Sequence, residues 1–236
     1  MFYFDSTYIL VIIGAVLSLG ASLLVQTTYN KYSKVRSATG FTGAEAATRL
    51  LHYNGIYDVV VNHVAGSLTD HYDPKTKTLN LSDGVYQGTS VAAIGVAAHE
   101  CGHAVQDAEG FAPLHIRGAM VPVARIGTSV SWPLIFIGYL MGNFGGGMGQ
   151  TIMMAGAVLF SLAVLFQLVT LPVEINASTR AVACLDNAGI MGDEELSMVK
   201  KVLTAAAMTY LAALAAYVLQ LLRLLVLANG GRRRRG

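Results

Sequence analysis

Four long apolar stretches constrain the fold of this 236-residue chain more than any other feature. Each comes close to the roughly 20 residues that a membrane-spanning helix needs. They cover residues 8–25, 120–141, 151–171 and about 202–228. Hydrophobic residues make up 54% of the chain and charged residues only 13%, which is too few charges for an ordinary soluble domain. The sequence therefore predicts a mainly α-helical integral membrane protein with about four membrane helices.

Prolines and flanking residues predict where these stretches begin and end. Pro122 and Pro133 are expected to break the second stretch, since proline disrupts a helix interior. Pro172 follows the third stretch, so we expect that span to end at Leu171 and a new helix to begin there. The residues before the first stretch include no Lys or Arg, and no A-x-A cleavage site follows, which predicts a retained anchor.

The main polar block, residues 27–118, predicts a small α+β unit. Residues 42–56 are typical of a capped amphipathic helix, with Thr42 as N-cap, Glu45 three residues later and Gly55 as the stop. Residues 59–64 are short and β-branched, as in a strand. Residues 68–82 alternate around a DPKTK turn, which predicts a β-hairpin. Residues 90–107 predict a buried helix.

That last predicted helix contains the sequence HECGH. His99 and His103 are four residues apart, so both imidazoles lie on one helix face and can reach one zinc ion. Glu100 is rotated by about 100° from His99, which keeps it out of the ligand set but near a zinc-bound water. The alternative is a metal-free helix with two unrelated histidines. Burying these groups without a metal or a partner costs several kcal/mol, which favours the metal site.

A catalytic zinc needs a third protein ligand, and Glu174 is the best candidate. A carboxylate at the end of a membrane helix is costly unless it is paired or coordinated. The second and third spans form a hairpin that returns Glu174 to the side of the HECGH helix. The alternative is an interfacial carboxylate paired with Arg180. His71 and His115 are expected in the hairpin and in a surface turn, and neither is expected to bind the metal.

HECGH, the preceding DHYDPKTKTLNLSDGVY and the later LPVEINASTRA together resemble the YugP-type neutral zinc metallopeptidases of bacterial membranes. The chain is more distantly similar to the HtpX-type and CAAX-prenyl-protease-type membrane peptidases, whose third ligand is the Glu of an E-x-x-A-D helix. That resemblance implies a zincin-like unit with Glu174 as ligand. Ser178 stands where those families have Asp, so Asn176, Ser178 or Arg180 is expected to support the ligands.

These residues predict a membrane-bound, gluzincin-like zinc metalloendopeptidase. His99, His103 and Glu174 would hold one zinc per chain, and Glu100 would take a proton from a zinc-activated water and pass it to the leaving amine. Arg180 or a tyrosine is expected as a further donor to the oxyanion. One hairpin strand is expected either to pair with an extended substrate or to be a plain core strand. Its residues are Thr78, Leu79, Asn80, Leu81 and Ser82.

Three other functions fit parts of this sequence. A zinc transporter is disfavoured because only about residues 91–98 before His99 are continuously apolar, too few to cross a bilayer. A site-2-type protease would need a downstream Asn-Pro-x-x-Asp-Gly motif, and LDNAG at 185–189 does not match it. A zinc-binding scaffold without proteolytic activity stays open, because its ligands and base would look the same.

Charge placement predicts the side of the membrane. Lys and Arg are concentrated in residues 27–118 and 172–201, so the positive-inside rule places both blocks in the cytosol. The tail GRRRRG argues the other way, because a fourth full span would carry it outside; either that segment does not cross or the rule is overridden. The bilayer and a peptide or membrane-protein substrate are the expected partners, and nucleic acid is not. Cys101 and Cys184 are too few for a disulfide framework.

The predicted organisation has five parts. They are an anchor (1–26), the α+β catalytic unit (27–118), a transmembrane hairpin (119–172), a helix with the third zinc ligand (173–201), and a C-terminal apolar helix with a basic tail (202–236).

Overall fold

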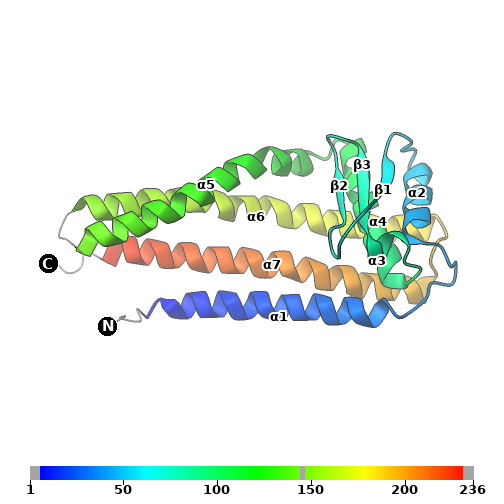
Figure 1. The fold of residues 1–236 in the computed structure, drawn as a ribbon, viewed down its shortest axis with the longest axis horizontal. Helices are drawn as coiled ribbons and strands as arrows, with labels where there is room; N and C mark the ends of the chain where they lie inside the picture. Colours follow the sequence, from blue (N-terminus) through cyan, green and yellow to red (C-terminus); the bar gives the residue numbers. More distant parts are fainter. Residues whose placement is uncertain (1–5, 144–146, 231–236) are drawn as a thin grey trace. The chain divides into compact units, whose positions relative to one another are not determined.

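The computed structural model describes residues 6–143 and 147–230, and most of them are helical. Four helices are long and apolar enough to cross a membrane (Figure 1). They are α1 (Tyr8–Tyr32), α5 (Ala112–Asn143), α6 (Gly147–Asn187) and α7 (Asp193–Gly230). The prediction of a mainly α-helical chain with about four membrane helices is therefore confirmed. The arginine tail lies outside the described residues.

The predicted helix breaks at the prolines are wrong. Helix α5 runs through Pro122 and Pro133, and α6 runs through Pro172 to Asn187, so no new helix begins before Glu174. Each proline removes one backbone hydrogen bond, and the many remaining bonds of a long helix keep it continuous. As a result Glu174 lies in the interior of a helix of 41 residues.

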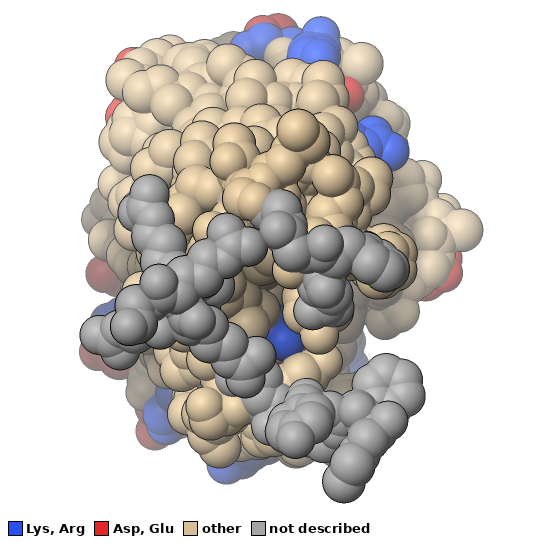
Figure 2. All heavy atoms as spheres, turned by 90° about the vertical axis from the view of Figure 1, so that its left-hand side faces the viewer, with Lys and Arg blue, Asp and Glu red and all other residues tan. Residues whose placement is uncertain are grey.

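The chain forms two compact units. The first, here called the helical unit, comprises Met1–Gly20, Ile116–Leu171 and Tyr210–Gly236. Phe160 lies in its core, stacked on Tyr217 with ring centroids 5.6 Å apart and edge-on to Trp132. The only charged residues among those described in this unit are Arg117, Arg125 and Arg223. This scarcity of charge fits a lipid environment. In the view of Figure 2 uncharged residues cover most of the described surface.

The second unit, here called the mixed unit, comprises Ala21–His115 and Pro172–Thr209. It contains three strands, β1 (Val60–Val64), β2 (His71–Asp73) and β3 (Thr78–Ser82), in the order β1-β3-β2. Strand β3 pairs antiparallel with β2, which confirms the predicted hairpin, and parallel with β1. The central strand of the sheet is therefore β3, and β2 forms one edge (Figure 1).

Helices α2 (Gly43–Tyr53), α3 (Asp83–Tyr86) and α4 (Val91–Ala108) complete the mixed unit. Thr42 and Glu45 form the predicted capping box at the start of α2, and Gly55 follows its end with φ +73°. The core of the unit joins the buried faces of α2, β3 and α4 to α6 and α7. This packing holds α4 against both the sheet and the Glu174 segment of α6.

Candidate zinc site

Helix α4 carries the HECGH sequence and confirms the helix predicted there. Ser90 caps it by accepting a hydrogen bond from the Ala93 N–H at 3.1 Å. His99 and His103 lie one helical turn apart, with ring centroids separated by 4.8 Å. Glu100 and His103 are buried, with 8% and 7% of their surface exposed. The helix thus brings two imidazoles and one carboxylate into the interior of the mixed unit.

Gly102 allows α6 to come close to these histidines. A Cβ atom at this position would collide with the main-chain carbonyl of Ala177 on α6. The absence of a side chain at Gly102 therefore permits the close packing of α6 against α4. The close approach offsets the roughly 1 kcal/mol that glycine costs within a helix.

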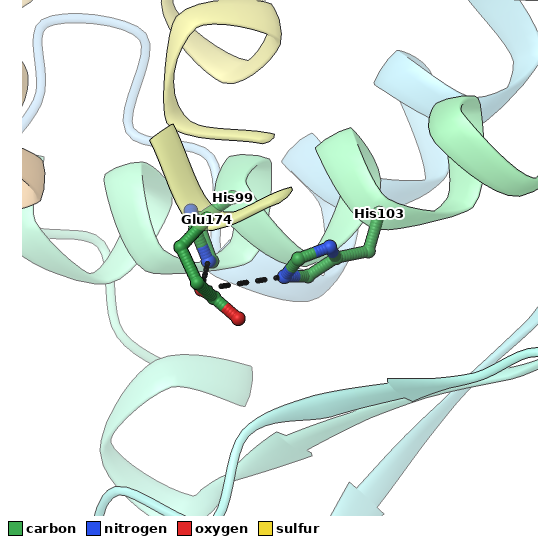
Figure 3. Close-up of side chains that lie close together, drawn as sticks. All are labelled: His99, His103 and Glu174. Atoms are coloured by element: carbon green, nitrogen blue, oxygen red, sulfur yellow. Dashed lines mark hydrogen bonds and ion pairs between the residues drawn. The ribbon is translucent and has the colours of Figure 1, made fainter. Parts of the chain in front are cut away.

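Glu174 reaches the two histidines from α6. Its Oε2 atom lies 3.2 Å from His99 Nε2 and 3.6 Å from His103 Nε2, and only 2% of the residue is exposed. Figure 3 shows the carboxylate and the two rings converging on one point. One ligand atom from each of the three residues lies within 4.8 Å of the others. The three side chains predicted as zinc ligands are thus brought together from two helices.

The donor set and its spacing fit zinc. Two imidazole nitrogens and one carboxylate oxygen are ligands that zinc accepts in catalytic sites. Ligands at about 2.0–2.2 Å from a tetrahedral ion lie roughly 3.3–3.5 Å from one another. The separations of 3.2 and 3.6 Å between the histidine nitrogens and Glu174 bracket that value, and the ligand atoms of the two histidines lie within 4.8 Å of each other. Of the residues described, these three form the cluster that could hold a metal ion.

Hydrogen bonds on the far side of each ring orient the two imidazoles. Ser178 Oγ lies 3.2 Å from His99 Nδ1, and Gln106 Oε1 lies 2.9 Å from His103 Nδ1. Both Nε2 atoms therefore face Glu174 while both Nδ1 atoms have partners, the usual arrangement of metal-binding histidines. Ser178, one of the residues expected to support the ligands, thus contacts His99 on the side away from Glu174. Gln106, in contrast, is not among the predicted site residues, although it follows His103 by one helical turn.

The surroundings of His103 favour its protonated form when no metal is bound. Burial lowers the pKa of the imidazole, but the hydrogen bond to Glu174 and the negative charges of Glu100 and Glu174 outweigh it. The net effect is a pKa above the usual 6.5. A zinc ion at this position would therefore compete with a proton for His103 Nε2.

Glu100 faces the edge of the sheet. Its Oε2 atom accepts a hydrogen bond from the main-chain N–H of Tyr72 on β2, at 3.0 Å. The Tyr72 hydroxyl donates to Asp107 Oδ2 at 2.8 Å, and Lys77 Nζ donates to the same oxygen at 2.7 Å. Burial raises the pKa of Asp107, but these bonds outweigh it and hold the pKa below its usual range. Tyr72 therefore fixes β2 along α4, from Glu100 to Asp107.

The strand predicted to receive a substrate is in the wrong place for that role. Residues Thr78–Ser82 form the central strand, with β1 hydrogen-bonded on one side and β2 on the other. A strand paired on both sides has no free edge for another strand. The other alternative, a core hairpin strand, agrees with the burial of Leu79, Leu81 and Ser82. The edge that lies beside Glu100 belongs to β2 instead.

The remaining candidate residues lie beside the three ligands. Arg180 forms an ion pair with Glu109 at 2.7 Å, and its Nε donates to Asn176 Oδ1 at 2.7 Å. Asn176 in turn accepts from Gln106 at 2.9 Å. His71 contacts the Thr69 carbonyl and Asn80, and His115 lies 4.0 Å from Asp107. Neither histidine belongs to the ligand cluster, as expected.

Comparisons with known proteins identify the family of this chain. Residues 7–229 match the family described as "Putative neutral zinc metallopeptidase", so the chain belongs to that family of zinc peptidases. A curated relative is the "Putative membrane protease YugP" of Bacillus subtilis (strain 168). It is 45% identical over 217 residues, which cover 92% of this chain and 93% of that protein. The resemblance to the YugP-type neutral zinc metallopeptidases is thereby confirmed. No solved structure matches the chain.

Proposed function

We propose that this protein is a membrane-bound zinc metalloendopeptidase. It would bind one zinc ion per chain, held by His99, His103 and Glu174. The observation that carries the proposal is the convergence of their three ligand atoms beside Glu100, within a family named for zinc peptidases. A buried carboxylate facing two imidazole Nε2 atoms forms a site that a divalent cation stabilises. Helix α4 with its two histidines and the neighbouring sheet would form a zincin-like, gluzincin-type unit.

The reaction would depend on a division of roles between the ligands and Glu100. When bound, zinc supplies the Lewis acid that makes water nucleophilic at neutral pH and polarises the peptide carbonyl. Glu100 follows His99 directly, so it lies beside the ligand set without belonging to it. Its carboxylate would accept the proton of the attacking water and deliver it to the nitrogen of the leaving amine. The small exposure of Glu100 keeps bulk water away from this proton transfer.

The open edge of β2 would bind the substrate backbone. Because the Tyr72 N–H points to Glu100, it points away from β3, and in an antiparallel pair the Tyr72 carbonyl then points the same way. An extended peptide could pair with these two groups as an added strand. Its amide would then lie next to Glu100, which is where the scissile bond must be for the proton transfer.

Three residues on α6 would support the ligands. Ser178 would orient His99. Arg180 would hold Asn176, and Asn176 would hold Gln106 in its contact with His103. Arg180 is already paired with Glu109, which favours this supporting role over direct contact with the oxyanion. An oxyanion donor would then come from another group, as expected for hydrolysis of an amide.

The mixed unit, which contains the proposed active site, would face the cytosol at the surface of the cell membrane. The mixed unit carries nine Lys and Arg residues, and the positive-inside rule favours the cytosolic side for such a segment. They are Lys31, Lys34, Arg36, Arg49, Lys75, Lys77, Arg180, Lys200 and Lys201. Attachment to membrane helices favours membrane proteins or their juxtamembrane segments as substrates.

The test is proteolysis by detergent-purified protein. Wild type and Glu100→Gln would be compared on a quenched peptide library and on reconstituted membrane proteins, each with and without a chelator. Zinc-dependent cleavage that is lost in Glu100→Gln, with zinc still bound, supports the peptidase. Zinc binding without cleavage in wild type would instead support a scaffold, and zinc flux into proteoliposomes would support a transporter. The location of HECGH on α4, outside the four candidate membrane helices, disfavours transport.

Cleavage of soluble peptides alone, with membrane-embedded ones left intact, would contradict the proposed substrate class but not the peptidase activity.

A further inference from the structure

Gln106 is the most completely satisfied polar side chain near the candidate zinc site. It has no exposed surface. Its Oε1 atom lies 2.9 Å from His103 Nδ1, and its Nε2 atom lies 2.9 Å from both the Val173 carbonyl and Asn176 Oδ1. A primary amide has one acceptor and two donor hydrogens, and all of them are used here. A buried glutamine with every group paired specifies one arrangement of its neighbours.

The Val173 carbonyl determines which way round this amide lies. A main-chain carbonyl can only accept a hydrogen bond, so the atom facing it must be the NH₂ group of Gln106. The oxygen of the amide then faces His103, and His103 Nδ1 must be the donor. A neutral imidazole with its proton on Nδ1 has its lone pair on Nε2. That is the nitrogen that faces Glu174 at 3.6 Å.

The hydrogen bonds continue from Gln106 to the surface. Asn176 receives hydrogen bonds from Gln106 Nε2 and from Arg180 Nε, so its oxygen must face both donors. Arg180 is held in turn by Glu109 at 2.7 Å. A chain of hydrogen bonds therefore leads from an ion pair between α6 and the end of α4 to the Nδ1 atom of His103. Each donor and acceptor along it is fixed by its neighbour.

We propose that Gln106 is a positioning residue that holds His103 in its Nδ1–H form and couples it to the turn of α6 that carries Glu174. The role of Gln106 in metal binding rests on the proposed zinc site. The tautomer of His103 follows from the contacts of the Gln106 amide alone. Val173 directly precedes Glu174, so the single Gln106 side chain links two of the three ligands. Loss of its acceptor would free His103 to adopt the other tautomer, in which Nε2 carries a proton and cannot bind metal.

Two measurements on detergent-purified protein test this inference. The first is the ¹⁵N chemical shift pattern of the histidine rings in zinc-free protein, at alkaline pH where His103 is neutral, with assignment by His103→Ala. The second is zinc affinity, measured by competition with a coloured chelator. Both would be made on wild type, Gln106→Leu and Gln106→Glu. The exposed Gln87→Leu is the matched control, since it makes the same change on the surface of the mixed unit.

We expect the Nδ1–H form in wild type and its loss in Gln106→Leu, with zinc affinity reduced about 10- to 100-fold. Gln106→Glu keeps an acceptor for His103 but cannot donate to Val173, so it should retain the Nδ1–H form and recover most of the zinc affinity. Gln87→Leu should behave as wild type. If Gln106→Leu fails to fold, the tautomer of His103 in wild type and in Gln106→Glu still tests the inference.

An Nε2–H form of His103 in zinc-free wild type would overturn the inference. Equal losses of zinc affinity in Gln106→Leu and Gln106→Glu would also overturn it, because packing alone would then explain both. Wild type that shows the Nδ1–H form but binds no zinc would leave the positioning by Gln106 supported and would refute the proposed zinc site instead.

Discussion

The main-chain N–H of Tyr72 lies 3.0 Å from Glu100 Oε2, so the edge of the sheet is hydrogen-bonded to the carboxylate proposed as the base. This contact comes from β2, which has only three residues, and Tyr72 is the middle one. The same N–H is the one that a bound peptide could use. Substrate pairing with β2 and positioning of Glu100 are therefore coupled through one amide.

Removing the main-chain N–H of Tyr72 tests whether substrate pairing with β2 and the position of Glu100 are coupled. Tyr72→Pro removes the N–H, and loss of a hydrogen bond to a charged group costs about 1.5–3 kcal/mol. We expect kcat/KM for an extended peptide to fall roughly 10- to 100-fold. Tyr72→Phe keeps the N–H and loses only the hydroxyl bond to Asp107, so its loss should be much smaller. Equal losses in the two variants, both folded by circular dichroism, would rule out a role for the main-chain group.

Gly102→Ala should destabilise the protein although alanine is the better helix former. The added methyl group would meet the Ala177 carbonyl, and overpacking of this kind costs about 1–3 kcal/mol. That exceeds the roughly 1 kcal/mol gained in helix propensity. Thermal unfolding in detergent should show a lower Tm and weaker zinc retention.

The matched control for this substitution is Gly118→Ala in α5, where a Cβ meets nothing within 4 Å. It should leave the Tm unchanged or raise it slightly. A Gly102→Ala protein as stable as Gly118→Ala would show that α4 and α6 are not in close contact.

Zinc should stabilise the protein much more at neutral to alkaline pH than in mild acid. The pKa of His103 in the metal-free protein is raised, so its charged form stabilises the metal-free fold below about pH 6.5, and this contribution is lost as the pH rises through the raised pKa. Zinc binding requires the neutral ring and so has the opposite dependence.

We therefore expect the rise in Tm on adding zinc to be small at about pH 6 and large at about pH 8. Differential scanning fluorimetry with and without a chelator measures it. An increase in Tm that is independent of pH would mean that His103 does not bind the ion.

Local signals in the sequence predicted the parts of the site that a single helix determines. The spacing of His99 and His103 gives their common face on any α-helix, and the capping box of Thr42 and Glu45 acts within one turn. The DPKTK turn likewise defines the hairpin of β2 and β3. Glu174 was identified by the cost of a carboxylate in an apolar stretch, and the structure places it beside both histidines.

Contacts between distant segments were not predictable in the same way. The pairing of β1 with β3 leaves β2 at the edge, and no residue of TLNLS indicates which strand is central. The partner of Glu100 is a main-chain N–H, which every residue except proline offers, so the sequence gives no sign of Tyr72. Gln106 has an ordinary helix-forming side chain, and its role becomes visible only when α6 supplies Val173 and Asn176. The predicted helix breaks at the prolines were wrong because long helices tolerate a single missing hydrogen bond.

The metal content of wild type beside Glu174→Ala, purified in detergent without chelators, tests the central claim most directly. Elemental mass spectrometry should find about one zinc per chain in wild type and far less in the variant. Glu194→Ala, which removes an exposed carboxylate from the first turn of α7, should keep the wild-type content. Zinc retained in Glu174→Ala, or absent from wild type, would contradict a site formed by His99, His103 and Glu174.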